Sequence, residues 1–188
     1  ALVGELFKYQ IRVEDLNEGA NLKYDLIKGP HGMQLDKNGK ILWVPKAAQI
    51  NYNDFQVSVT DGYGTDIQSG KIFINNPPSI ISTPKPVGLT GHTWRYKLTT
   101  EDLNGDRVTY RAVRLQKFSK FDRRTATIEW TPRKNQDGVN DFILMAVDEH
   151  GATTTHNFQV HIFYDPSAKQ LVNSGWPLML TFVGVVFA

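Results

Sequence analysis

The sequence contains no cysteine, and this absence excludes several classes of protein at once. Disulfide scaffolds, thiolate nucleophiles and cysteine-ligated zinc sites all require that residue. The cellular compartment stays open, because a lack of cysteine fits an exported bacterial protein as well as a cytosolic one. The net charge is also small, at +2 over 188 residues, so no global electrostatic field favours nucleic acid as a partner.

Sequence signatures of catalysis are missing as well. The chain has no Gly-x-Ser-x-Gly elbow, no His-Glu-x-x-His helix and no phosphate-binding loop. Among the histidines, His156 and His161 lie five positions apart on a predicted strand, so they point to opposite faces and cannot chelate a metal together. Paired carboxylates occur only in predicted turns. We therefore expect no enzymatic activity. The first residues, Ala1 to Gly4, also lack the basic start and cleavage site of a signal peptide.

What the sequence does contain is one motif that occurs twice. Trp43-Val44-Pro45-Lys46 returns as Trp130-Thr131-Pro132-Arg133, at an offset of 87 residues (the difference between 43 and 130). The same offset relates Gln49 to Gln136, Asn53-Asp54-Phe55 to Asn140-Asp141-Phe142, Asp61 to Asp148 and Gly64 to Gly151. A period of this length is typical of a whole β-sandwich, since solenoid repeats run about 20–50 residues. The chain is therefore expected to be a duplicated domain.

The patterning within each copy predicts an all-β fold. Apolar residues alternate with polar ones from Phe7 to Val13 and from Phe55 to Thr60, which is typical of half-buried strands. Asp36 to Gly39 predicts a tight turn with one residue at positive φ. No window before residue 167 has helical periodicity. Because Trp43 and Trp130 recur at a strand end, we expect both to pack in or beside the core.

The expected domains are residues 1–76, 77–166 and 167–188. Asn75-Asn76-Pro77-Pro78 predicts a short, stiff linker, because proline fixes φ and restricts the residue before it. Residues 77–84 form an extended segment ahead of the second copy, and the first copy has no counterpart of it. We therefore expect the first sandwich to lack its first strand.

Two features of the second copy suggest contacts with a partner. Its strand from Phe142 to Val147 is apolar on both faces, which predicts cover on both faces by the other domain, the tail or another chain. The candidate contact residues there are Ile143, Met145 and Val147. Residues 107–124 carry a basic stretch that includes Arg111, Arg114, Lys117 and Lys120. This stretch indicates either a solvated surface or a patch for an acidic partner or anionic lipid headgroups.

The C-terminal segment is apolar to its last residue. Its candidate membrane-contacting residues are Trp176, Leu178, Leu180, Phe182, Val183, Val186 and Phe187. As a helix this run reaches only about 20 Å, against a hydrocarbon core of about 30 Å. It contains no charge, however, and Trp176 stands where an interfacial aromatic residue is found. We predict the start of a transmembrane helix that anchors the domains on the periplasmic or outer side. The alternative is an amphipathic or core-packing segment.

The combined motifs resemble the cadherin-like, dystroglycan-type immunoglobulin-fold repeats of bacterial surface proteins. The residues that carry this resemblance are Glu101 to Asp106, Tyr110, Ile128 to Pro132, Gln136 to Gly138, Asp148 to Gly151, Asp61 to Gly64 and Asn75 to Pro78. The resemblance covers about residues 1–166. It implies tandem Greek-key sandwiches with adhesive, spacer or scaffolding roles, and no catalysis.

Cadherins bind calcium between repeats, so the resemblance also raises the question of a metal. Calcium needs about 6–8 oxygen ligands. Here the linker has Asn75 and Asn76 where calcium-binding cadherins place aspartates, and Trp-x-Pro stands in place of their central acidic motif. We expect no cofactor, with Asp102, Asn104 and Asp106 as the remaining candidate calcium ligands.

These features together predict a non-catalytic, membrane-anchored structural or accessory subunit. Its two extracytoplasmic domains would contact partner proteins in a membrane complex. One alternative is an adhesion or carbohydrate-binding module that uses exposed aromatics such as Tyr63 or Trp94. Another is a plain spacer. No feature of the sequence favours a nucleic-acid partner.

Overall fold

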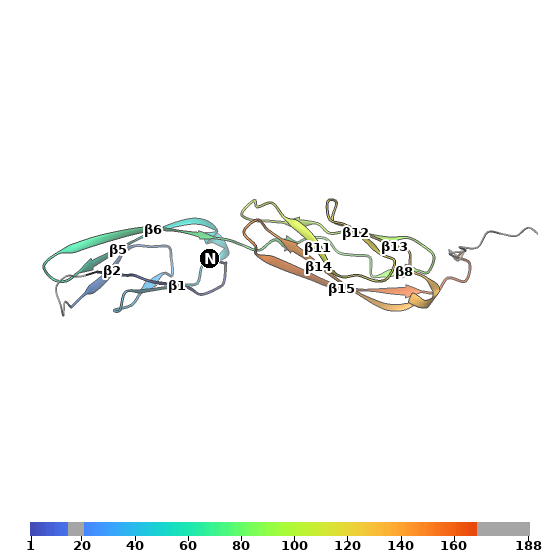
Figure 1. Cartoon of the computed structure of the whole chain (residues 1–188), viewed down its shortest axis with the longest axis horizontal. Coiled ribbons are helices and arrows are strands. Elements are labelled where there is room, and N and C mark those ends of the chain that lie inside the picture. Colours follow the sequence, from blue (N-terminus) through green and yellow to red (C-terminus); the bar gives the residue numbers. More distant parts are fainter. Residues whose placement is uncertain (15–20, 169–188) are drawn as a thin grey trace, which may run out of the picture.

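The computed structural model describes residues 1–14 and 21–168, and this part of the chain is built from β-strands and turns. The strands form two groups that lie end to end along the long axis of the molecule (Figure 1). The buried apolar residues form two separate clusters, one from residues 11–74 and the other from residues 94–162. Each group therefore has a core of its own.

The first group contains two three-stranded sheets. One has the order β1 (Phe7–Gln10), β4 (Lys40–Trp43) and β3 (Gln34–Leu35), and the other has β2 (Lys23–Lys28), β5 (Asn51–Thr60) and β6 (Thr65–Ile74). All of these pairings are antiparallel. Phe55, Val57 and Val59 are buried on β5 while the residues between them are more exposed, so the alternation predicted for this strand is confirmed.

The second group follows the same plan with additional strands. Its larger sheet has the order β11 (Thr109–Arg114), β14 (Gly138–Val147), β15 (Thr153–Phe163) and β8 (Val87–Leu89). The facing sheet contains β12 (Lys120–Asp122), β13 (Thr127–Trp130) and β9 (Trp94–Lys97). A short ladder joins β7 (Ser79–Ile80) to β10 (Thr100–Glu101). The β8–β15 pairing is parallel, whereas the other pairings in this group are antiparallel.

The repeated motif has the same structural role in both groups. Trp43 and Trp130 are buried at the ends of β4 and β13, as predicted. A short 3-10 turn follows each, η1 (Ala47–Gln49) and η2 (Lys134–Gln136). The side chain of Gln136 accepts a hydrogen bond from the backbone of Arg133 and donates one to the Lys117 carbonyl. Gln49 makes the corresponding pair of bonds in the first group. The motif therefore fixes the entry to the long hairpin in each copy.

Two expectations about exposure are corrected by the structure. Trp94 is buried, at 5% exposed, and its ring stacks on Phe142, so it cannot serve as an exposed aromatic platform. Val147 is also buried within the chain, at 6% exposed, so it is not available on an open face. Ile143 and Met145 are half-buried on the outer face of β14.

The predicted apolar tail, including every candidate membrane-contacting residue, lies outside the described residues. Among the residues that the structure does describe, no helix is long and apolar enough to cross a membrane. The membrane helix and the bounds of the three expected domains stay predictions.

Candidate functional site at the junction of the two groups

Polar side chains gather where the first group meets the second, and the loop after β10 supplies several of them. In this loop the carboxylate of Asp102 accepts hydrogen bonds from the backbone N–H groups of Asn104 and Asp106, at 2.9 and 3.2 Å. Gly105 between them has φ of 79°, a conformation that glycine adopts at little cost. Asp102 thus stabilises this turn through its carboxylate, as aspartates commonly do in turns.

Asn104 ties this loop to the first group. Its side-chain oxygen accepts a 2.7 Å hydrogen bond from the backbone N–H of Asn76 in the linker. Its side-chain nitrogen donates to the side chain of Asn51 and to the carbonyl of Ile74, at 2.9 and 3.0 Å. One residue of the second group therefore holds both the linker and the end of the preceding hairpin.

A second contact joins the linker to the turn between β14 and β15. Asn75 is 3% exposed and donates a 2.7 Å hydrogen bond to the carboxylate of Asp148, which is 5% exposed. The other oxygen of Asp148 accepts from the backbone N–H groups of His150 and Ala152. A buried carboxylate is stable only where such donors surround it. Three N–H groups therefore satisfy the buried carboxylate of Asp148.

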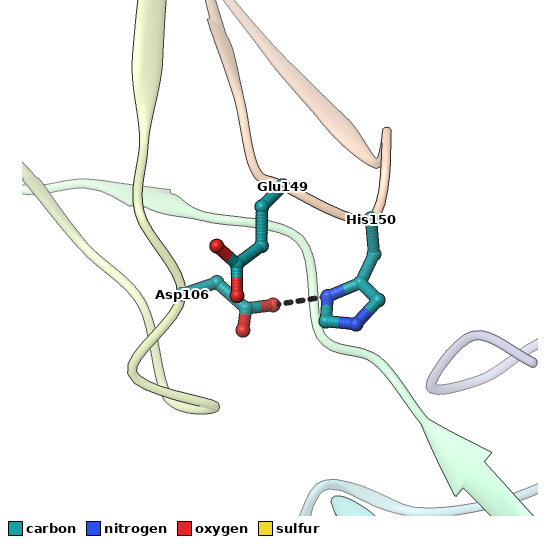
Figure 2. A group of neighbouring side chains, drawn as sticks. All are labelled: Asp106, Glu149 and His150. Carbon is teal, nitrogen blue, oxygen red and sulfur yellow. Dashed lines mark hydrogen bonds and ion pairs between the residues drawn. The ribbon is translucent and has the colours of Figure 1, made fainter.

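His150 completes the junction from the same turn. Its Nδ1 lies 2.8 Å from a carboxylate oxygen of Asp106, as the dashed line in Figure 2 shows. This hydrogen bond to Asp106 is the main reason why the pKa of His150 is raised above its ordinary value. The His150 ring also packs against Phe73 of β6, with 4.6 Å between ring centroids. His150 therefore contacts both groups.

Carboxylates converge at this place. Asp102, Asp106 and Asp148 bring one oxygen each within 4.8 Å of one another, and Asp106, Glu149 and His150 form an overlapping set. In Figure 2 the carboxylates of Glu149 and Asp106 lie side by side. Two buried oxygens have no hydrogen-bond partner among the described residues, Oδ2 of Asp102 and Oδ1 of Asn75. An unpaired buried oxygen costs free energy unless a donor or a cation meets it.

The structure separates the predicted basic residues from one another. Arg111 and Arg114 lie on β11, directly opposite Met145 and Ile143 of β14. Lys120 instead lies on β12 in the facing sheet, opposite Glu129. Lys117 is exposed in the connection between those strands. Only the two arginines therefore share a sheet with the candidate apolar contact residues, and an ion pair of 3.7 Å links Arg114 to Asp141.

Sequence reasoning found part of this junction and missed the rest. Asp102, Asn104 and Asp106 were candidate ligands, and the structure brings them to the junction. Asn75, Asp148 and His150 were read only as linker and turn residues. Asp148 recurs at the repeat offset as Asp61, but Asp61 accepts hydrogen bonds from Tyr63 and Gly64 of its own hairpin turn, so the recurrence indicated a turn and not the junction.

Comparisons with known proteins agree with this architecture. Residues 77–163 match the family model described as "Putative Ig domain" (He_PIG). Residues 77–163 form an Ig-like domain. No curated protein matches the chain in a sequence search. The Ig-like fold is typical of non-catalytic binding and structural domains.

Solved structures with similar folds are distant in sequence. Extracellular domains 3–5 of Drosophila OTK are 9% identical with a TM-score of 0.50, over 86% of this chain and 58% of that one. The titin I-band fragment I67-I69 is 15% identical with a TM-score of 0.49, over 87% and 62%. An endo-fucoidan hydrolase of glycoside hydrolase family 107 is 18% identical with a TM-score of 0.39. This last match covers 88% of our chain and 27% of the hydrolase, so the chain spans about a quarter of that protein. The OTK match shows the fold alone.

Proposed function

We propose that the chain is a non-catalytic structural segment in which two cadherin-like Ig domains act as one connected unit outside the cytoplasm. The observation that supports this most is the junction. Asn104 and Asp148 of the second group hold the linker directly, at 2.7 Å each. A plain flexible tether would not need the two residues before its prolines, Asn75 and Asn76, to be held by side chains of the second group. The segment would thus fix the distance and the relative direction of the parts of a larger assembly that it joins.

In this proposal the apolar tail anchors the segment in a membrane, and the outer face of β14 contacts a partner chain. Ile143 and Met145 form a small apolar row there. Its neighbours are Arg114 and Arg111 on β11, and Asn157 and Thr155 on β15. Such a face suits a partner surface that is apolar in its centre and acidic at its rim. The domains would then serve an accessory role in a membrane complex.

The experiment compares the intact chain with a version ending at Asp165, each extracted in mild detergent and affinity-purified. We expect the intact form in the membrane fraction with stoichiometric partner chains, and the short form in the soluble fraction alone. If both forms are soluble and monomeric, the anchor is wrong and a spacer or ligand-binding role takes its place.

The contact face is tested separately by Ile143→Asp combined with Met145→Asp. We expect loss of the partner without loss of the fold. Val139→Asp is the matched control, because Val139 is 59% exposed on the same strand but pairs with His161 at its other end. Unchanged partner retention in the double variant would exclude this face.

A second function is favoured by the unpaired oxygens at the junction. We propose that Asp102, Asp106 and Asp148 can hold a divalent cation of the calcium type, with Asn75 Oδ1 as a further oxygen. The bound charge would offset the repulsion among the carboxylates and stiffen the connection. Calorimetric titration of calcium into chelator-treated protein tests this, with Asp102→Asn as the variant. If calcium releases no binding heat in either protein, or the same heat in Asp102→Asn as in wild type, the cation site is excluded.

A carbohydrate-binding role rests on Tyr63 alone, since Trp94 is buried. Tyr63 is 99% exposed at the tip of the β5–β6 hairpin. Loss of glycan binding in Tyr63→Ala would favour this alternative.

A further inference from the structure

A hollow of about 1380 Å³ lies at the end of the second group that points away from the linker (Figure 1). It is bounded by the turn before β12, by η2 and by the residues that follow β15. The residues that line it include Phe118, Lys120, Glu129, Arg133, Lys134 and Tyr164. The hollow shares no residue with the junction or with the apolar row on β14, so neither of the sites proposed above uses it.

The turn before β12 holds an aromatic residue of the hollow in a costly conformation. The N–H of Ser119 donates to the Gln116 carbonyl at 3.2 Å, and Phe118, the third residue of this turn, has φ of 68°. A side chain in this left-handed region costs free energy, which is why glycine usually occupies it. Phe118 is also 54% exposed, so burial of its ring does not offset the cost.

The corresponding turn in the first group contains a glycine instead. There the N–H of Met33 donates to the Pro30 carbonyl at 3.1 Å, and the third residue is Gly32, with φ of 84°. Both turns lead into the edge strand that pairs with the strand of the buried tryptophan. Folding therefore does not require a phenylalanine at this place. Strained residues that the fold does not require are typical of functional sites.

The ring of Phe118 carries a cation. The guanidinium carbon of Arg133 lies 3.5 Å from the centroid of that ring. Gln136 fixes the pair, because it accepts from the Arg133 N–H at 3.0 Å and donates to the carbonyl of Lys117, next to Phe118, at 3.1 Å. A guanidinium that rests on a ring keeps N–H groups along its edge, where they match the two oxygens of a carboxylate. The pair is thus arranged to receive a carboxylate.

Three cations line the hollow without a carboxylate partner. They are Lys120, Arg133 and Lys134. None of them forms an ion pair among the residues that the structure describes. Lys134 instead lies 5.1 Å from the centroid of the Tyr164 ring. At the repeat offset their counterparts in the first group are Met33, Lys46 and Ala47, so the fold common to both groups does not need the charges of the two lysines.

The acidic residues around the hollow leave these cations in excess. Glu129 pairs with Arg95 at 3.2 Å, and Asp165 lies 2.8 Å from His92. Asp137 is the lining acid that has no ion pair within the described part of the chain. An anion in the hollow would therefore meet a net positive charge.

The hydroxyl groups of the hollow favour a peptide over a sugar as the source of that anion. The Thr131 hydroxyl lies 3.0 Å from the Thr93 hydroxyl, and the Thr90 hydroxyl accepts from the backbone N–H of Asp165 at 2.9 Å. These groups are thus already bonded within the chain, whereas a sugar needs neutral partners for its many hydroxyls. An acidic peptide needs cations and apolar walls, and Phe118 and Pro132 supply such walls.

We propose that this hollow binds an acidic segment of a partner protein. Arg133, supported by the Phe118 ring, receives the carboxylate of a glutamate or aspartate, and Lys120 and Lys134 attract the neighbouring carboxylates. The strain at Phe118 then serves binding and not folding. This inference is independent of the proposed membrane anchor, the cation site and the contact face on β14.

The experiment measures the binding of a fluorescein-labelled octaglutamate peptide to the intact chain in mild detergent, by fluorescence anisotropy. Arg133→Lys keeps the charge but loses the planar guanidinium, so we expect binding to weaken about tenfold. Arg123→Ala is the matched control, because it removes a full charge from the same group while Arg123 is not a lining residue. We expect the control to change binding less than about twofold.

Phe118→Gly separates binding from folding. Glycine relieves the left-handed strain, so the urea midpoint of the second group should equal or exceed that of wild type, while octaglutamate binding falls about tenfold. The proposal is wrong if this variant binds as tightly as wild type. It is also wrong if the urea midpoint falls, because Phe118 would then serve the fold.

Three further outcomes would overturn the proposal. The attraction is absent or diffuse if octaglutamate shows no saturable binding at about 1 mM, or if Arg133→Lys and Arg123→Ala weaken it equally. Tighter binding of tetragalacturonate than of octaglutamate would assign the hollow to an acidic sugar. Binding by the version ending at Asp165, but not by the intact chain, would show that the chain's own C-terminal residues occupy the hollow.

Discussion

Asn104→Ala is the sharpest test of how the two groups are connected. The substitution removes three hydrogen bonds from the second group to the linker and the first group, with lengths of 2.7, 2.9 and 3.0 Å. A net contribution of about 0.5–1.5 kcal/mol for each bond, reduced by partial exposure, gives a loss of about 1–3 kcal/mol in the free energy that holds the junction closed. This corresponds to about 5- to 150-fold in the population of the open junction.

The amide of Asn76 reports this change directly, because its N–H donates to the Asn104 side chain. We expect its exchange rate, measured by NMR, to rise by the same factor in the variant. Asn135→Ala is the control, since Asn135 is exposed in η2, far from the linker in sequence. Equal exchange rates for Asn76 in wild type and in Asn104→Ala would refute the reasoning, because the linker would then be held by something other than Asn104.

Three further predictions concern the two cores. Gly70→Ala should destabilise the first group by about 1–3 kcal/mol in urea denaturation, because its Cβ would meet the Phe55 ring at 2.2 Å. Burial lowers the pKa of His156, so its protonation favours the unfolded state, and as the pH drops below about 6.5 the melting temperature of the second group should fall relative to that of His156→Gln. The raised pKa of His150 acts in the opposite direction in both proteins and cancels in this difference. Trp43→Phe should lower the free energy of unfolding by about 1 kcal/mol more than Trp130→Phe. The reason is that the Trp43 indole N–H donates to a carbonyl, whereas that of Trp130 is buried without a partner among the described residues. If that hydrogen bond contributes nothing, the two variants will shift the urea midpoints of their groups equally.

Much of the fold could be predicted from the sequence, because its signals are local and occur twice. The alternation from Phe55 to Thr60 and the recurrence of Trp43 and Trp130 identified a strand and the centres of two cores. The first half of β6 is different, because residues 65–69 contain a single apolar residue, Ile67, and their hydropathy does not predict a strand. Their pairing with β5 makes them one.

The junction was harder to predict because it depends on contacts between residues far apart in the chain. Asn75 and Asp148 are 73 positions apart, and nothing in the hydropathy of either stretch indicates that they meet. The exposure of Trp94 was misjudged for a related reason. Its indole N–H donates to the backbone carbonyl of Lys85, which lies outside its own sheet, and its ring stacks on Phe142 and Phe158. Neither contact can be predicted from the hydropathy of residues 94–97.

The parallel pairing of β8 with β15 has a mechanical consequence. The chain enters the second group at the linker and leaves it after β15, at the opposite end (Figure 1). Tension applied between those points pulls β8 and β15 in opposite directions along their length. The pairs of Val87 with His161, Gly88 with Ile162 and Leu89 with Phe163 then share the load in shear, and they must break together. Rupture under load follows the unfolding rate, so this short ladder would set the force that the second group withstands.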